Sequence, residues 1–220
     1  GVRVSTHALE YAIQSYSTIS DAVAYTYQQE GHAFYVLSFP TAGKTWVFDA
    51  AIGAWHERAG FSNGDFVRHR SNCQAAFNGV PHVGDYENGK VYVLDLSVYE
   101  DNGVPQKWLR SWRALPTGQN NLKRTAQHCL QIDMESGVGI LSGQGSDPQV
   151  MLRFSDDGGH TWSNEKWAAA GKIGEYQKRV FFRRLGMTVK LRDRVYELSG
   201  SDPTKLVIVG AELTVTGTNG

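Results

Sequence analysis

The chain has 220 residues, of which 41% are hydrophobic and 20% are charged, and this balance excludes a disordered polypeptide. The formal net charge is zero, so composition gives no overall attraction to nucleic acid or to a membrane surface. No apolar run reaches the roughly 18 residues that cross a bilayer. The 24 glycines, 6 Trp, 10 Tyr and 9 Phe indicate many short strands with tight turns.

The first 20 residues differ from the rest of the chain. Ser5 or Thr6 can cap a short helix, whose stripe of Leu9, Ile13 and Tyr16 has helical spacing. We therefore predict a short N-terminal helix and no other. A β-rich region begins at Asp21.

Four strands joined by short turns follow the helix. The alternation of polar and apolar residues predicts strands at 22–27, 32–39, 44–49 and 54–58, with turns rich in Gly and Pro between them. Four antiparallel strands connected in this way are the unit of a propeller blade.

The blade pattern returns further along the chain. The segment 43–49 (GKTWVFD) is echoed by 89–95 (GKVYVLD), at an offset of 46 residues and with four of seven positions identical. Periods of this size are typical of four-stranded blades. The second blade is expected to have strands near 73–77, 81–86, 89–95 and 107–113.

The remainder predicts more strands and longer loops. We expect a linker at 115–121, a strand at 124–134, a loop at 136–148, and strands near 179–182, 194–198, 205–209 and 211–215. The predicted fold is all-β: one β-propeller-like domain over 1–220, with a helical lead-in at 1–20, two blade repeats at 21–116, and the remaining strands at 117–220. The first residue is not Met, which is the pattern of a fragment of a longer protein.

The stretch 155–162 (SDDGGHTW) matches the Asp box, a motif of propeller hairpins. Its glycines suit a tight turn, and its Asp and Ser side chains can bond the amides of that turn. We interpret Ser155, Asp157, Gly159, Thr161 and Trp162 as a structural hairpin, with Trp162 as its apolar anchor.

Few other patterns indicate chemistry. Asp156 and Asp157 could form a carboxylate pair, but on a tight turn they are expected to be solvated. The seven histidines lack metal-ligand spacing, so we predict no catalytic residues, no metal and no cofactor. Cys73 and Cys129 are predicted to be two buried thiols of a protein folded in a reducing compartment, with a single disulfide as the alternative.

One segment, 172–194, is strongly basic. The segment contains eight cationic side chains and two carboxylates, and aromatic residues are interspersed among these charges. Such a pattern favours a surface that faces DNA or an acidic partner, although an ordinary solvated strand pair gives the same pattern. The candidate residues are Lys178, Arg179, Arg183, Arg184, Arg192 and Arg194.

Several long stretches together resemble the C-terminal portion of the packaged-DNA stabilisation proteins of short-tailed bacteriophages, also called tail accessory, head-completion or tail-hub proteins. The stretches are GHAFYVLSFP at 31–40, TWVFD at 45–49, WHER at 55–58, VGDY at 83–86, DMESGVG at 133–139, the Asp box with its continuation to 165, GKIGEY at 171–176, RDRV at 192–195 and SDP at 201–203.

The resemblance implies a structural virion protein and not an enzyme. It implies a homo-oligomeric ring, hexamer-like in the full protein, that plugs or extends the portal channel and stabilises packaged DNA. Implied partners are the portal or adaptor, the tail needle, the tailspikes and the packaged DNA, with no membrane. The implied location is the virion tail, after assembly in the host cytoplasm. The alternative is an Asp-box propeller that binds or hydrolyses glycans, like a sialidase.

Overall fold

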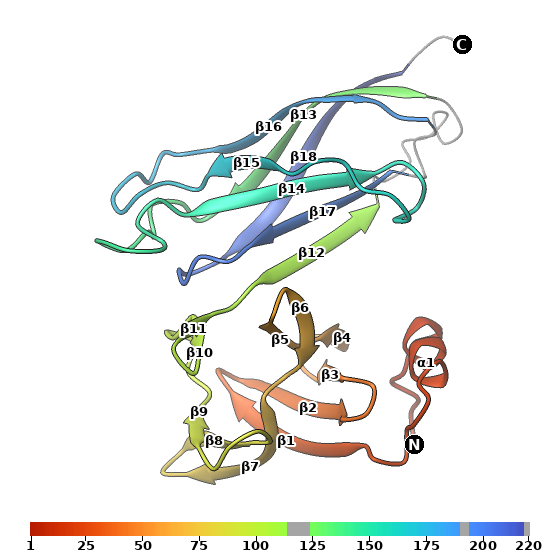
Figure 1. Ribbon diagram of the computed structural model, residues 1–220, viewed down its shortest axis with the longest axis vertical. Coiled ribbons are helices and arrows are strands. Elements are labelled where there is room, and N and C mark those ends of the chain that lie inside the picture. The colour runs from red at the N-terminus through yellow and green to blue at the C-terminus, as the bar shows by residue number, and fades with distance from the viewer. Residues whose placement is uncertain (114–123, 190–193, 218–220) are drawn as a thin grey trace. The chain divides into compact units, whose positions relative to one another are not determined.

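A computed structural model describes residues 1–113, 124–189 and 194–217 (Figure 1). The prediction of an all-β fold is confirmed, because apart from one short helix the regular elements are antiparallel strands. Within these residues no helix has the length and apolar character needed to cross a membrane. The chain forms two compact units, residues 1–96 and 97–220, where we expected a single domain.

The predicted helix is confirmed as α1, His7–Gln14. Thr6 caps it, because its Oγ1 accepts a hydrogen bond from the Leu9 amide at 3.2 Å. Tyr16 follows the helix and packs edge-on against Phe39, with ring centroids 5.2 Å apart. The Tyr16 hydroxyl also accepts a bond from Trp46 Nε1 at 2.9 Å. The N-terminal segment therefore lies on one face of the first sheet.

The first predicted blade is confirmed strand by strand. Its strands are β1 (Val23–Gln29), β2 (His32–Phe39), β3 (Lys44–Asp49) and β4 (Ala54–Glu57), each antiparallel to the next. A buried cluster of Tyr27, Val36 and Val47 lies on the face opposite the helix. A hairpin that we did not predict follows, formed by β5 (Ala59–Ser62) and β6 (Asp65–Arg68).

The second blade is only partly as predicted. Strands β7 (Ser71–Phe77), β8 (Val80–Asp85) and β9 (Val91–Val93) form an antiparallel sheet of three strands. The expected fourth strand is instead β12 (Trp108–Arg113), which belongs to the second unit and pairs with β17 (Val195–Gly200). The described residues form no closed propeller.

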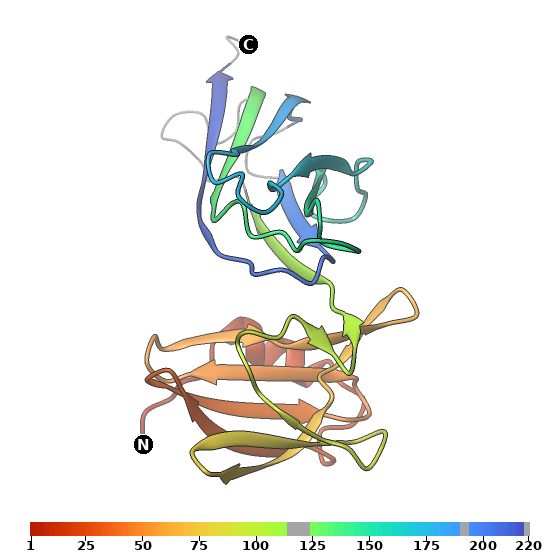
Figure 2. The same ribbon diagram turned by 90° about the vertical axis from the view of Figure 1, so that its left-hand side faces the viewer.

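The second unit contains two sheets, which Figure 2 shows as separate layers. One sheet has the order β12-β17-β14-β15, where β14 is Gln149–Ser155 and β15 is Lys166–Ala169. The other has the order β16-β13-β18, with β16 at Val180–Met187, β13 at Thr125–Met134 and β18 at Ile208–Gly217. A short hairpin, β10 (Glu100–Asp101) and β11 (Val104–Pro105), precedes them.

The core of this unit is contributed by both sheets. Leu130, Ile132, Leu152, Phe182 and Leu198 are among its buried side chains. Segment 117–220 is therefore not a continuation of the blades but a unit with its own core. The predicted linker at 115–121 lies outside the described residues.

The two cysteines are free thiols in the structure. Cys129 is half-buried, whereas Cys73 is exposed on β7. The prediction of two buried thiols is therefore wrong for Cys73.

Candidate functional site

The Asp-box hairpin is held by bonds from its side chains to its own backbone. The Ser155 hydroxyl donates to Asp157 Oδ1 at 2.6 Å and accepts from the Gly159 amide at 2.8 Å. Asp157 accepts from the Thr161 amide at 2.9 Å and from the Thr161 hydroxyl at 2.6 Å. Gly159 has a φ of 105°, which favours glycine at the bend. These contacts are made within the turn itself.

The carboxylate of Asp157 is stabilised in its charged form. Hydrogen bonds from Ser155 and then from Thr161 hold its pKa well below the ordinary value for aspartate. The group is exposed, but its oxygens are occupied within the turn. It is therefore poorly suited to donate a proton at neutral pH.

The adjacent carboxylate, Asp156, anchors the hairpin to the core. Its two oxygens accept bonds from Arg194 Nε at 2.6 Å and from Arg194 Nη2 at 2.5 Å. The Arg194 side chain is only 1% exposed, and Asp156 is 27% exposed. This bidentate pair is the strong form of a carboxylate–guanidinium contact.

The rest of the Arg194 guanidinium is also engaged. Its Nη1 donates to the Leu185 carbonyl at 2.7 Å, and its plane lies over the Phe154 ring at 4.2 Å. Arg194 was predicted to belong to a surface that faces DNA or a partner. That prediction is wrong, because this cation is buried and neutralised by Asp156.

Two further residues complete this polar core, and we did not predict them from sequence. Tyr196 is fully buried and donates to Gln127 Oε1, and burial raises the pKa of its phenol to about 12. Gln127 also accepts from Arg194 Nη1 at 3.4 Å. A bulge between Gln127 and Cys129 turns Gln127 to the core, and the local sequence carries no clear signal of this bulge.

Trp162 is half-buried, so it anchors the hairpin less deeply than we expected. The Arg153 guanidinium lies over its ring at 4.7 Å, and Arg153 also pairs with Glu197. The Ser163 amide donates a hydrogen bond to the Phe154 carbonyl at 2.8 Å, which joins the two ends of the loop. Trp162 therefore makes a surface contact, while Asp156 makes the contact that reaches the core.

The remaining basic residues divide into two groups. Lys178, Arg179, Arg183 and Arg184 are exposed, along or just before β16. Arg184 has a φ of 58° and belongs to the bulged part of that strand. Arg192 lies outside the described residues. Four of the six predicted cations are thus available on the surface.

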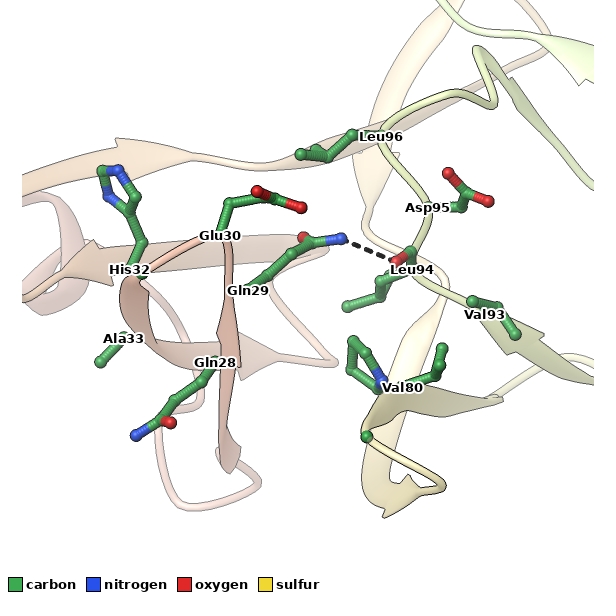
Figure 3. A pocket seen from close by; sticks show the side chains of 13 residues that line it. Gln28, Gln29, Glu30, His32, Ala33, Val80, Val93, Leu94, Asp95 and Leu96 are labelled. Carbon is green, nitrogen blue, oxygen red and sulfur yellow. Dashed lines mark hydrogen bonds between the residues drawn. The ribbon is translucent and has the colours of Figure 1, made fainter.

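The first unit has an open groove of about 540 Å³ beside the turn between β1 and β2 (Figure 3). Glu30 and His32 line it from the first blade, and Leu94 and Leu96 from the segment after β9. Gln29 Nε2 donates a hydrogen bond to the Leu94 carbonyl at 2.8 Å and so links the two walls of the groove. Within the described ranges no three His, Cys, Asp or Glu side chains are grouped to hold a metal ion.

These features define an all-β protein with a blade-type unit followed by a two-sheet unit. In the second unit, the buried polar cluster around Arg194 packs the Asp-box hairpin against the core. Comparison with protein families gives the same division. Residues 1–99 match the family model described as Bacteriophage P22 Gp10, beta-propeller, and residues 108–216 match Bacteriophage P22 Gp10, beta-sandwich. The chain belongs to this family of phage virion structural proteins. A search of curated proteins finds no match.

Proposed function

We propose that the chain is a rigid subunit of a phage tail hub, which extends or plugs the portal channel and retains the packaged DNA. Family membership over both units is the observation that carries the proposal. In this role the chain acts as part of a homo-oligomeric ring, hexamer-like in the full protein. The ring contacts the portal or adaptor and offers a platform to the tail needle and tailspikes.

The internal contacts of the second unit support a mechanical role. The bidentate pair of Asp156 and Arg194 ties the hairpin to both sheets, because Arg194 immediately precedes β17 and its Nη1 donates to the Leu185 carbonyl of β16. A unit fastened in this way resists deformation, which a subunit under the pressure of packaged DNA requires.

The same contacts disfavour a glycan-hydrolysing function. A sialidase-like site needs free carboxylates and arginines that converge on a substrate. Asp157 is bound within its turn, and Asp156 and Arg194 are bound to each other. The protein is therefore proposed to work without catalysis.

Deleting the gene that encodes the chain tests this role. Particles assembled without the protein are expected to lose their DNA, which nuclease sensitivity and genome quantification measure. Supplying the protein during assembly should restore retention. Particles that hold their DNA equally well without it would contradict the proposal, and turnover of a sialoside by the purified protein would favour the glycan alternative.

The exposed cations of β16 are proposed to face DNA. The variant Arg183→Glu with Arg184→Glu should weaken binding of the protein to duplex DNA. It should also reduce the salt dependence of binding: the slope of log binding constant against log salt concentration becomes shallower by about 0.9 for each phosphate that the protein no longer neutralises. The matched control is Arg110→Glu with Arg113→Glu, which reverses two exposed cations of β12. Equal effects of the two variants would indicate that net charge, and not this surface, is responsible.

A further inference from the structure

Two glycine-rich loops lie at the same end of the second unit, where β14 and β16 begin (Figure 1). The first loop is residues 136–147 and the second is residues 171–179. Their backbones contact each other directly, because the Gly174 amide donates a hydrogen bond to the Gly137 carbonyl at 3.2 Å. We call this pair of loops the loop end.

Glycines allow the two loops to pack closely. A Cβ on Gly139 would lie 3.1 Å from the backbone nitrogen of Ile173, and a Cβ on Gly171 would lie 3.0 Å from Lys178 Cβ. Gly171 also has a φ of 104°, which favours glycine. Contacts between the loops therefore fix the shape of the loop end.

The loop end exposes large apolar side chains. The first loop is closed at its base by a hydrogen bond from the Ile140 amide to the Gly145 carbonyl at 3.0 Å, and Leu141, within this closed turn, is 86% exposed. On the second loop Tyr176 is 74% exposed and Ile173 is 53% exposed. Apolar side chains gathered on a surface in this way mark an interaction site.

Cations flank these apolar side chains. The second loop exposes Lys172, Lys178 and Arg179. It also exposes Glu175, whose Oε2 accepts a hydrogen bond from the Lys172 amide at 3.0 Å. Asp147 is exposed at the end of the first loop, so the loop end holds three cations and two carboxylates. Its charge is weakly positive.

We propose that the loop end binds the surface of a lipid bilayer that contains anionic lipids. Leu141 and Ile173 enter the boundary between headgroups and acyl chains, where the burial of apolar surface stabilises the contact. Tyr176 lies at the level of the headgroups, where amphipathic aromatic side chains are enriched. Lys172 and Lys178 contact anionic headgroups. The binding is reversible, because so few side chains bury less apolar surface than a lipid anchor does.

The chemistry of the loop end favours a lipid surface over duplex DNA. Binding to DNA depends on cations that neutralise phosphates, whereas Leu141 presents an exposed alkyl group that a phosphate does not contact. The cations that are proposed to face DNA, Arg183 and Arg184, lie within β16 and outside the loop end. The family resemblance implies no membrane partner, so a lipid contact is a second role of the chain and does not depend on the tail hub.

A fluorophore in the first loop tests the proposal on the purified chain. Nitrobenzoxadiazole is attached at Leu141→Cys, in a chain that also carries Cys73→Ser and Cys129→Ser. Vesicles of phosphatidylcholine and phosphatidylglycerol should raise its emission at least about twofold and shift it to shorter wavelengths, because the dye enters an apolar layer. Vesicles of phosphatidylcholine alone should give a weaker response. The same dye at Ile52→Cys is the matched control and should not respond, because Ile52 is 66% exposed in a turn without cations, between β3 and β4.

Flotation of the unlabelled chain with the same vesicles measures binding without a dye. Leu141→Ser with Ile173→Ser should lower the vesicle-bound fraction at least about fivefold, because it removes the apolar surface that enters the bilayer. Ile52→Ser should leave that fraction unchanged. Circular dichroism checks that each variant keeps the parent fold.

The proposal requires a response at Leu141 and none at Ile52. Equal responses at the two positions would show that the dye enters the bilayer by itself, and equal flotation of all variants would place the lipid contact elsewhere. A dye response to duplex DNA in place of vesicles would assign the loop end to nucleic acid. The absence of any vesicle response would leave a protein as its occupant. Each of these results overturns the proposal.

Discussion

Arg194 shows at the scale of one residue how a charge can be placed in an apolar core. The side chain is 1% exposed, so its guanidinium has lost its water and depends on protein acceptors. Asp156 supplies two of these acceptors, and the Leu185 carbonyl supplies another. Removing the carboxylate would leave a buried and uncompensated charge.

We expect Asp156→Ala to lower the free energy of unfolding by about 3 kcal/mol. This value lies near the lower end of the cost of breaking a buried ion pair, because Asp156 is partly exposed. Urea denaturation followed by tryptophan fluorescence measures the change. Asp133→Ala, at an exposed carboxylate of β13, is the control and should change little. Adding Arg194→Met to Asp156→Ala should recover part of the loss, and a loss unchanged by that addition would argue against the unpaired charge as its cause.

His69 makes the stability of the first unit sensitive to acid. Burial removes water from the imidazole and disfavours its charged form, and three neighbouring arginines repel the positive charge. The pKa of His69 therefore falls from 6.5 to about 3. The arginines are Arg58, Arg70 and Arg68. Between those two pKa values the unfolded chain binds a proton that the folded chain does not. Stability is thus complete above the unfolded pKa and declines as pH falls toward the folded one.

The substitution His69→Gln should flatten this decline. Urea unfolding between about pH 7 and about pH 4 measures it, as the slope of unfolding free energy with pH. His7→Gln, at an exposed histidine of α1, is the control and should keep the parent slope. A parent-like slope in His69→Gln would show that other groups cause the acid sensitivity.

At the scale of elements, β12 is positioned by the contact of an aromatic side chain with a glycine. Trp108 pairs with Gly200 across β12 and β17. A Cβ on Gly200 would lie 2.6 Å from Trp108 Nε1, so the indole occupies the space that a side chain would need. This contact helps to explain why 108–113 joins the second unit instead of completing a blade.

We expect Gly200→Ala to displace Trp108 and to cost about 1–3 kcal/mol of stability, as overpacking does. Thermal unfolding together with the near-UV circular dichroism of tryptophan reports both effects. Gly210→Ala is the matched control, because Gly210 lies in β18 and a Cβ added there would meet no atom within 4 Å. It should change stability by less than about 0.5 kcal/mol. Equal effects at the two positions would exclude the indole contact as the cause.

At the scale of the whole molecule, the chain is two units with separate cores. The second unit holds a cluster of buried residues from both of its sheets, including Leu130, Leu152 and Leu198. A unit with its own core can fold alone. We therefore expect residues 97–220, expressed separately, to unfold cooperatively in urea, and Leu152→Ala to lower their stability by about 2–5 kcal/mol. A non-cooperative transition of the parent fragment would contradict this expectation.

Local features of the sequence predicted local structure well. The Thr6 cap and the turns before His32 and Lys44 depend on residues a few positions apart, and each forms as expected. The 46-residue repeat likewise identified corresponding strands in two blades. Contacts between distant positions were not predictable, as the exposed Cys73 and the buried Gln127 show.

The sequence by itself determined the all-β class, the helix, the first blade and the family resemblance, because hairpin geometry and alternation are set by neighbouring residues. Only the tertiary structure decided that β12 joins β17, that the chain divides after residue 96, and that Arg194 is a buried partner of Asp156. A basic run looks the same in sequence whether its charges face water or a carboxylate 38 positions away. Burial depends on which surfaces meet, and that depends on the whole fold.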